Sequence, residues 1–376
     1  MFQPKKIVLA LRSKFCKTIY VNRFSEVVRR EWAGNMVVTI KDVAKLAGVS
    51  PGTVSNVFSS NRAVKAELVE RVRKAAAELG YEPDRAASQL RAGKARVVAV
   101  LLPDLDNPFF TSLVASIEAN VRDEGFDIIV ASSHGDAVEE ARRLSALLAW
   151  RPAGLVIVPC SDAFVSRKLV SGGGVPFVVA DRVPSHFDGE AVTVDNVGAG
   201  TQAAEHLVRL GHRRFVVAAS TLRLQNIRDR CEGIEAVLAR EGLASPTLIE
   251  VGLDFDTASE RLGVFMEGEQ QATAFIALTN FATLGILASA NRSGLSVPRD
   301  LSVVGFDDYS WMHAVSPPLT AIRQPVDMMG RVIWSRLRRH IVGRSEPVAD
   351  ERLSCDLVVR ASTASPPSVG DALRIA

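Results

Sequence analysis

The chain has 376 residues, which is too long for one core of ordinary size, so two or three domains are expected. Its composition, 47% hydrophobic and 23% charged, is typical of a soluble globular protein, and no apolar run approaches the roughly 18 to 20 residues of a membrane span. The net charge of +3 divides into +11 for residues 1–96 and −8 for the remainder, so only the first quarter is suited to a polyanion. The four cysteines form no C-x-x-C pair, which argues against a zinc site or a disulfide framework and favours a reducing cytoplasm.

Residues 1–36 fit no export signal, because their apolar run is short and is interrupted by Arg12. Met36 stands three residues before the first predicted helix. We interpret residues 1–36 as a disordered basic extension or as a segment upstream of a true start at Met36.

The segment 38–58 has the pattern of two short helices that meet at a tight corner. Thr39 can cap the first helix together with Asp42, three residues later. Gly48 can end that helix with a positive φ, and Ser50 can cap a second helix that has Pro51 at its first position. This pattern indicates a helix-turn-helix.

The second of these helices points small, uncharged or amide-bearing residues outward, and such residues allow a helix to enter a major groove. An ordinary helical hairpin with a polar face has the same spacing and stays open as an alternative. The residues expected to contact DNA here are Thr39, Ser50, Pro51, Gly52, Thr53, Ser55 and Asn56.

Three stretches appear in a distinctive order: TIKDVAKLAGVSPGTVSNVF, ELVERVRKAAAELGYEPDRAASQLRAG and VVAVLLPDLDNPFF. In this order they resemble the lactose-repressor/galactose-repressor (LacI/GalR) family of bacterial transcription regulators, and spaced motifs extend the resemblance to about Thr363. The resemblance implies a small all-α helix-turn-helix headpiece followed by an α/β two-lobed periplasmic-binding-protein-like domain, with parallel sheets covered by helices.

The headpiece is expected to span residues 37–82, with a third helix over 66–79 that Gly80 ends. Residues 83–95 follow as a hinge helix or linker. Its one large apolar residue, Leu90, can wedge between base pairs while arginines hold phosphates. In the resembled family such a helix folds on operator DNA, so we expect Arg85, Ala87 and Leu90 to contact DNA; an exposed leucine in a flexible connector is the alternative.

From residue 96 to residue 363, short apolar runs alternate with amphipathic helical stretches. This pattern predicts parallel sheets covered on both faces, with enough strands for two of them. The resemblance assigns the region to effector binding and dimerisation. The tail 364–376 follows and no leucine heptads occur near it, so we expect a homodimer.

Polar and aromatic residues follow several of the predicted strands, where open parallel sheets bind ligands. Carboxylate, amide and guanidinium groups there suit hydroxyls or a carboxylate, which predicts a pocket for a sugar or sugar derivative. The expected effector-binding residues are Asn107, Phe109, Phe110, Arg182, Asp195, Arg230, Phe255, Asn280, Asp307 and Trp311.

The stretch GAGTQA, residues 198–203, matches the glycine pattern of dinucleotide-binding proteins, but the following strand ends in Ser220 rather than in an acidic residue. An NAD-dependent oxidoreductase is therefore the weaker alternative, and an envelope sugar-binding receptor would need an export signal. No catalytic or metal-ligand motif is visible, so no enzyme activity, cofactor or metal is expected. We interpret the chain as a cytoplasmic, sequence-specific transcription regulator, most simply a repressor, that binds operator DNA and a small sugar-like effector.

Overall fold

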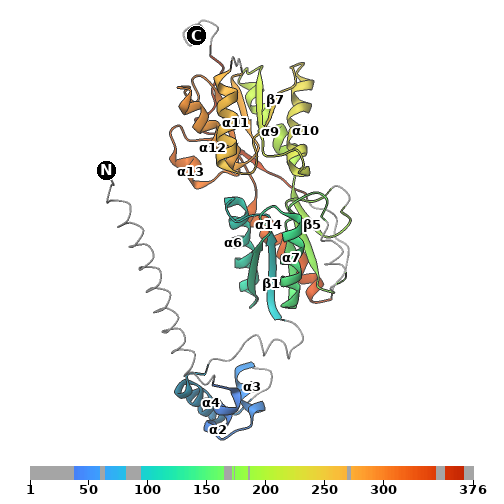
Figure 1. Cartoon of the computed structure of the whole chain (residues 1–376), viewed down its shortest axis with the longest axis vertical. Coiled ribbons are helices and arrows are strands. Elements are labelled where there is room, and N and C mark those ends of the chain that lie inside the picture. The colour runs from blue at the N-terminus through green and yellow to red at the C-terminus, as the bar shows by residue number, and fades with distance from the viewer. Residues whose placement is uncertain are drawn as a thin grey trace, which may run out of the picture. The chain divides into compact units, whose positions relative to one another are not determined.

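The computed structural model describes residues 38–59, 64–81, 95–164, 172, 174–184, 187–268, 272–343 and 352–367. The chain divides into two compact units, residues 1–93 and 94–376, which are described separately (Figure 1). The extension 1–36 and the expected hinge residues Arg85, Ala87 and Leu90 lie outside the described residues. Among the described residues, no helix has the length and apolar character needed to cross a membrane.

The described part of the first unit contains three helices, α2 (Ile40–Ala47), α3 (Pro51–Ser59) and α4 (Ala66–Leu79). The Asp42 carboxylate accepts hydrogen bonds from the Thr39 backbone N–H at 2.8 Å and from the Thr39 hydroxyl at 2.6 Å, which confirms the predicted start of α2. Gly48 and Gly80 end α2 and α4 with φ values of 63° and 64°, as the sequence predicts.

A single small core holds the three helices together. Val43 and Ala44 of α2, Val54 and Val57 of α3 and Val72 of α4 are all buried in it. The two helices of the predicted corner therefore pack through their apolar faces and leave the polar face of α3 outside the core.

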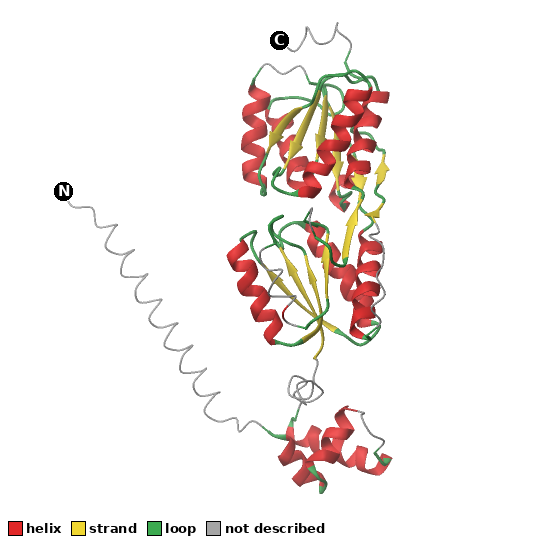
Figure 2. Ribbon diagram, turned by 90° about the vertical axis from the view of Figure 1, so that its right-hand side faces the viewer, coloured by secondary structure: helices red, strands yellow, loops and turns green. Residues whose placement is uncertain are grey.

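The second unit contains two six-stranded sheets, one in each lobe (Figure 2). The first has the order β11-β5-β4-β3-β1-β2, and the second has the order β12-β10-β9-β8-β6-β7. All neighbouring strands are parallel except β10 and β12. The strands are β1 (Ala95–Leu102), β2 (Asp127–Ser132), β3 (Pro152–Ile157), β4 (Phe177–Ala180), β5 (Ala191–Val194), β6 (Phe215–Ala219), β7 (Thr247–Glu250), β8 (Ala274–Ala277), β9 (Ser302–Phe306), β10 (Thr320–Arg323), β11 (Arg352–Leu353) and β12 (Asp356–Val358).

Helices cover both faces of each sheet, as expected for parallel strands with apolar residues on both sides. In the first sheet, alternate residues of β1 pack on opposite faces, with Val100 near Leu113 and Leu101 near Leu144. The helices are α6 (Pro108–Arg122), α7 (Ala137–Ala149), α9 (Asn196–Arg209), α10 (Gln225–Arg240), α11 (Phe255–Glu267), α12 (Asn280–Arg292), α13 (Ser310–Ala314) and α14 (Val326–Ile341). The predicted fold class, a helical headpiece with a two-lobed α/β domain, is confirmed.

The chain crosses between the lobes three times. It leaves the first sheet after β5, returns after β10 so that α14 packs beside α6, and leaves again between β11 and β12. The crossings lie at 195–196, 324–325 and 354–355. Residues next to them are therefore placed between the lobes, where the ligand site was expected.

Candidate functional site

The first candidate site is the outer face of α3. Ser50, Pro51 and Gly52 are exposed, and Thr53 and Asn56 are partly buried. The Ser50 hydroxyl accepts a hydrogen bond from the Thr53 backbone N–H at 3.1 Å, which is the predicted cap. The described α3 carries no charged side chain in its first or last turn, so short polar groups dominate this face.

The corner before α3 is held by Arg71 of α4. Its Nη2 atom donates to the Ala47 carbonyl at 2.6 Å, and also lies 3.4 Å from the Gly48 carbonyl. These carbonyls belong to the end of α2, where helical backbone partners are missing. The third helix therefore fixes the angle at which α3 leaves the corner.

The second candidate site is a cavity of about 30 Å³ between the two lobes, which we call the central cavity. From the first lobe it is lined by the end of β4 and the start of α6. From the second lobe it is lined by the ends of β6, β9 and β10 and the starts of α10 and α12. The lining residues are Asn107, Phe109, Phe110, Asp181, Arg182, Ser220, Leu224, Asn226, Ile227, Arg230, Thr279, Asp307 and Gln324.

Arg230 is the most constrained cation of this cavity. Its Nε donates to Asn196 Oδ1 at 2.9 Å, its Nη1 donates to the Leu278 carbonyl at 2.6 Å, and its guanidinium stacks 3.8 Å from the centre of the Phe306 ring. The residue is only 3% exposed. A planar, pre-oriented guanidinium of this kind is suited to directional hydrogen bonding with a ligand.

Arg182 and Asp181 lie together at the end of β4. The Arg182 guanidinium is 5.2 Å from the centre of the Phe110 ring. Burial lowers the pKa of Arg182, and burial likewise raises the pKa of Asp181 against the opposing charges of Arg230 and Arg182. Asp181 has a φ of 57°, a conformation that few non-glycine residues adopt.

Asp307 closes the cavity from the second lobe. Its carboxylate accepts hydrogen bonds from the Tyr309 hydroxyl at 2.9 Å and from Gln324 Nε2 at 2.5 Å. Burial raises the pKa of Asp307, although Arg230, Gln324 and Tyr309 all act in the opposite direction. The Tyr309 hydroxyl also lies 3.3 Å from Asn107 Oδ1, so this tyrosine connects the two lobes.

Three buried acceptor atoms around the central cavity have no hydrogen-bond partner among the described residues. They are Asp181 Oδ1, Asn226 Oδ1 and Gln324 Oε1. A buried acceptor without a donor costs about 1–3 kcal/mol, so each is a place where a ligand donor would be stabilising. Each of these three oxygen atoms can therefore accept a hydrogen bond from a ligand.

Six of the ten expected effector residues line the central cavity: Asn107, Phe109, Phe110, Arg182, Arg230 and Asp307. The other four do not appear among its lining residues. The Asp195 side chain caps α9 by accepting from Gly198 N–H at 2.9 Å, and Trp311 Nε1 donates to Asn280 Oδ1 at 3.2 Å. Phe255 is the first residue of α11 and is 41% exposed.

Several lining residues were not among the expected ones. Leu224, Asn226 and Ile227 come from the start of α10, where a helical pattern gives no sign of a ligand. Gln324 directly follows β10, so recognising that short strand would have pointed to it. Asp181 directly precedes Arg182 at the end of a predicted strand, so its position in the sequence favours a ligand-binding role as much as that of Arg182 does.

Gly200, the second glycine of the dinucleotide-like stretch, serves helix packing. A Cβ at Gly200 of α9 would overlap the Arg230 carbonyl of α10, and a Cβ at Gly233 of α10 would overlap the Val197 carbonyl of α9. The two helices thus approach each other through glycine. This contact accounts for Gly200 without a bound dinucleotide.

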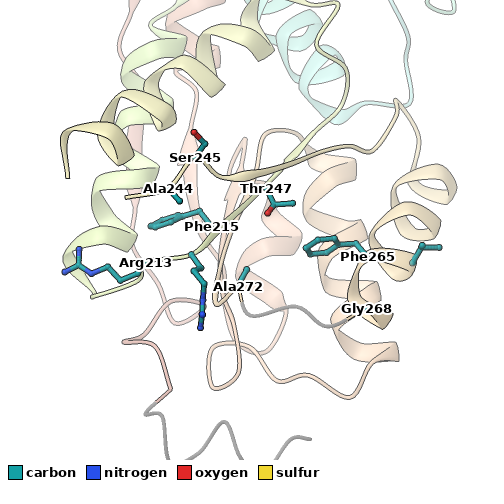
Figure 3. Close-up of a pocket in the computed structure, with 10 residues that line it drawn as sticks. Arg213, Phe215, Ala244, Ser245, Thr247, Phe265, Gly268 and Ala272 are labelled. Atoms are coloured by element: carbon teal, nitrogen blue, oxygen red, sulfur yellow. The ribbon is translucent and has the colours of Figure 1, made fainter. Parts of the chain in front are cut away.

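A cavity of about 550 Å³ lies at the opposite edge of the second sheet, where β6, β7 and β8 begin (Figure 3). Arg213, Phe215, Thr247 and Phe265 are among its lining residues. Ligands of open parallel sheets bind at the carboxyl ends of strands, so this cavity is not where an effector is expected. Within the described ranges, no three histidine, cysteine or acidic side chains are grouped to hold a metal ion.

Two regions of the chain match known protein families. Residues 39–84 match the family described as "Bacterial regulatory proteins, lacI family", and residues 204–363 match "Periplasmic binding protein-like domain". The chain is 28% identical to the HTH-type transcriptional repressor PurR of Glaesserella parasuis over 334 residues, which cover 87% of this chain and 98% of PurR. It is 29% identical to the ribose operon repressor of Escherichia coli over 299 residues, which cover 79% and 91%.

A solved structure of the lac repressor dimer, bound to operator and the anti-inducer ONPF, has the same fold. It superposes with a TM-score of 0.78 at 28% identity and covers 87% of this chain and 99% of its own. The predicted resemblance is confirmed by the two matched regions, by the long alignments with repressors and by this structural likeness. The chain thus combines a DNA-binding region of the LacI type with a periplasmic-binding-protein-like domain, and along most of its length it is similar to repressors of the LacI family.

Proposed function

We propose that this protein is a transcriptional repressor that binds operator DNA through α3 and responds to a hydroxyl-rich effector bound between its lobes. Its relatives are repressors by name, and the similar lac repressor structure is a dimer bound to operator. A dimer matches a near-palindromic operator, because its two-fold axis relates the two half-sites that its two headpieces bind. The domain boundaries 37–82, 83–95 and 96–363 belong to this proposal.

The observation that carries the effector assignment is the set of three buried acceptors around the central cavity that lack a donor. Asp181 Oδ1, Asn226 Oδ1 and Gln324 Oε1 accept no hydrogen bond from the described residues. Sugar hydroxyls donate as well as accept, whereas a carboxylate or phosphate only accepts. These acceptors suit the hydroxyls of a polyol or sugar, and the guanidinium groups of Arg182 and Arg230 can donate to the same hydroxyls.

The size of the central cavity supports control by lobe movement. About 30 Å³ holds one water molecule, so a sugar enters only when the lobes separate. A ligand that prefers a different separation of the lobes shifts the population of that state, and coupling of this kind typically changes DNA affinity by about 1–3 kcal/mol. Effector binding and operator binding are then linked through the body of the protein.

The test separates effector binding from DNA binding. Asp307→Asn keeps the size of the side chain and removes the charge that faces Arg230, so we expect loss of the effector response with operator affinity retained. A sugar panel is screened by thermal shift, and DNA from near the protein's own gene is titrated by fluorescence anisotropy. Failure of the wild-type protein to bind any such DNA at low salt, with and without sugars, contradicts the proposal.

A further inference from the structure

A second cavity, of about 410 Å³, lies between the lobes beside the central cavity, and we call it the side cavity. Its floor includes Asp181 and Thr193 of the first lobe, and one wall is the first half of α10. It shares Asp181 and Asn226 with the central cavity. The two cavities are therefore neighbours with a common boundary.

The boundary between them carries two of the three acceptors that lack a partner. Asp181 is 4% exposed and Asn226 is 7% exposed, and the Oδ1 atom of each accepts no hydrogen bond from the described residues. Asn196 also lines the side cavity, and its Oδ1 accepts from Arg230 Nε of the central cavity at 2.9 Å. A ligand that extends from one cavity into the other could donate hydrogen bonds to these two Oδ1 atoms, to which the described residues donate none.

The two cavities differ in what they can hold. The central cavity takes about one water molecule, whereas 410 Å³ lies within the range of about 300–1,000 Å³ found for small-molecule sites. The side cavity is thus large enough for a ring without any movement of the lobes. A single sugar unit that contacts only Arg230 and Asp307 would leave the side cavity empty.

The wall formed by α10 is acidic. Gln225, Asp229 and Glu232 are spaced four and three residues apart, which places them on one face of the helix, and all three line the side cavity. Gln225 Nε2 donates to Asp229 Oδ1 at 2.5 Å. With Asp181, the lining carries three carboxyl groups against the one guanidinium of Arg352, so the chemistry of this cavity favours a neutral hydroxyl donor and disfavours an anion.

We propose that the effector is a neutral two-unit sugar, a disaccharide or glycoside, whose second unit occupies the side cavity. This inference rests on the proposed function. The first unit binds between Arg230 and Asp307, and the link between the units passes between Asp181 and Asn226. Hydroxyls of the second unit donate to Asp229 and Glu232.

Isothermal titration calorimetry on the full chain tests this with matched sugars: glucose and galactose as single units, cellobiose, lactose and methyl glucoside as extended ones. We expect at least one extended sugar to bind about tenfold more tightly than any single unit, as one or two additional hydrogen bonds would give. The double variant Asp229→Asn/Glu232→Gln removes that advantage and leaves the affinity for single units unchanged. Glu235→Gln, on the same helix but not among the residues lining the side cavity, is the matched control.

The outcomes are distinguishable. Equal affinity for single and extended sugars would overturn the two-unit assignment while leaving a sugar effector in place. The double variant could also keep the preference for extended sugars, as the control Glu235→Gln is expected to do. That result would place the second sugar unit outside the side cavity and would overturn the two-unit assignment. If no sugar of either kind binds the wild-type protein, the sugar effector of the proposed function fails and this inference fails with it.

Discussion

The Nε atom of Arg230 donates to Asn196 Oδ1 at 2.9 Å, so the central cation of the effector cavity is held by the first residue after a crossing between the lobes. Asn196 is 4% exposed and Arg230 is 3% exposed. The chain that connects the lobes therefore also orients the group that faces the ligand. A change in the angle between the lobes is felt directly at Arg230.

Asn196→Ala removes this acceptor and leaves a buried guanidinium N–H without its partner. We expect the free energy of unfolding to fall by about 1–3 kcal/mol, together with weaker effector binding. Urea unfolding followed by circular dichroism measures the first effect. Asn291→Ala, at an exposed position near the end of α12, is the control, and equal stability of the two variants would contradict a role for the Asn196 contact.

Gly48→Ala places a side chain where φ is 63° and where a Cβ would lie 2.9 Å from Arg71 Nη2. We expect the headpiece to lose about 1–2 kcal/mol of stability, because a left-handed conformation is unfavourable for residues with a Cβ. Amide hydrogen exchange of α2, α3 and α4 measures this loss. Gly52→Ala in α3 meets only an ordinary contact with Ser50 Oγ at 3.6 Å, so it should not weaken protection.

Asn56→Ala should alter base preference, since an asparagine amide in a major groove can pair with an adenine edge. The expected loss is about 1–3 kcal/mol for the preferred operator and less for variants at that base pair. Binding to a set of single-base operator variants measures it. The control Lys41→Ala removes an exposed positive charge from α2 and should at most weaken binding to all operator variants by the same factor. If Asn56→Ala shows the same uniform loss of affinity, Asn56 does not contribute to base recognition.

The stability that the buried histidines His206 and His212 contribute should be lost on mild acidification. Burial lowers the pKa of His212, which contacts Thr273 Oγ1 at 2.8 Å, Ser302 Oγ at 3.1 Å and the Ala364 carbonyl at 2.9 Å, and burial also lowers the pKa of His206. Because the unfolded chain takes up protons at a higher pH than the folded chain, this stability is present above about pH 6.5 and is lost as the pH falls below it.

The thermal midpoint at pH 7.5 and at pH 5.5 measures this loss, at about 2–4 °C per kcal/mol for a domain of this size. His212→Gln removes one titrating group from the contact with residue 364, so its midpoint should depend less on pH. A pH dependence equal to that of the wild-type protein would show that His212 is not responsible.

The sequence by itself was enough to predict the local elements of this protein. Thr39 with Asp42, Gly48 and Gly80 mark the helix ends of the headpiece, because caps and positive φ values depend on residues close in the chain. Strands β1 to β9 were visible as short apolar runs, and most of them are buried on both faces of a sheet. Phe110, Arg182 and Asp307 were predicted as effector residues because the ends of parallel strands meet at one edge of a sheet, and all three line the central cavity.

Only the tertiary structure decided the rest. Strands β10, β11 and β12 were not predicted. They lie beside the crossings between the lobes, where Gln324 lines the central cavity and Arg352 lines the side cavity. Asn226, Asp229 and Glu232 look like ordinary polar positions of a helix until packing turns one face of α10 towards the first lobe. Contacts between residues distant in the chain depend on how the lobes fold together, and no local pattern records that arrangement.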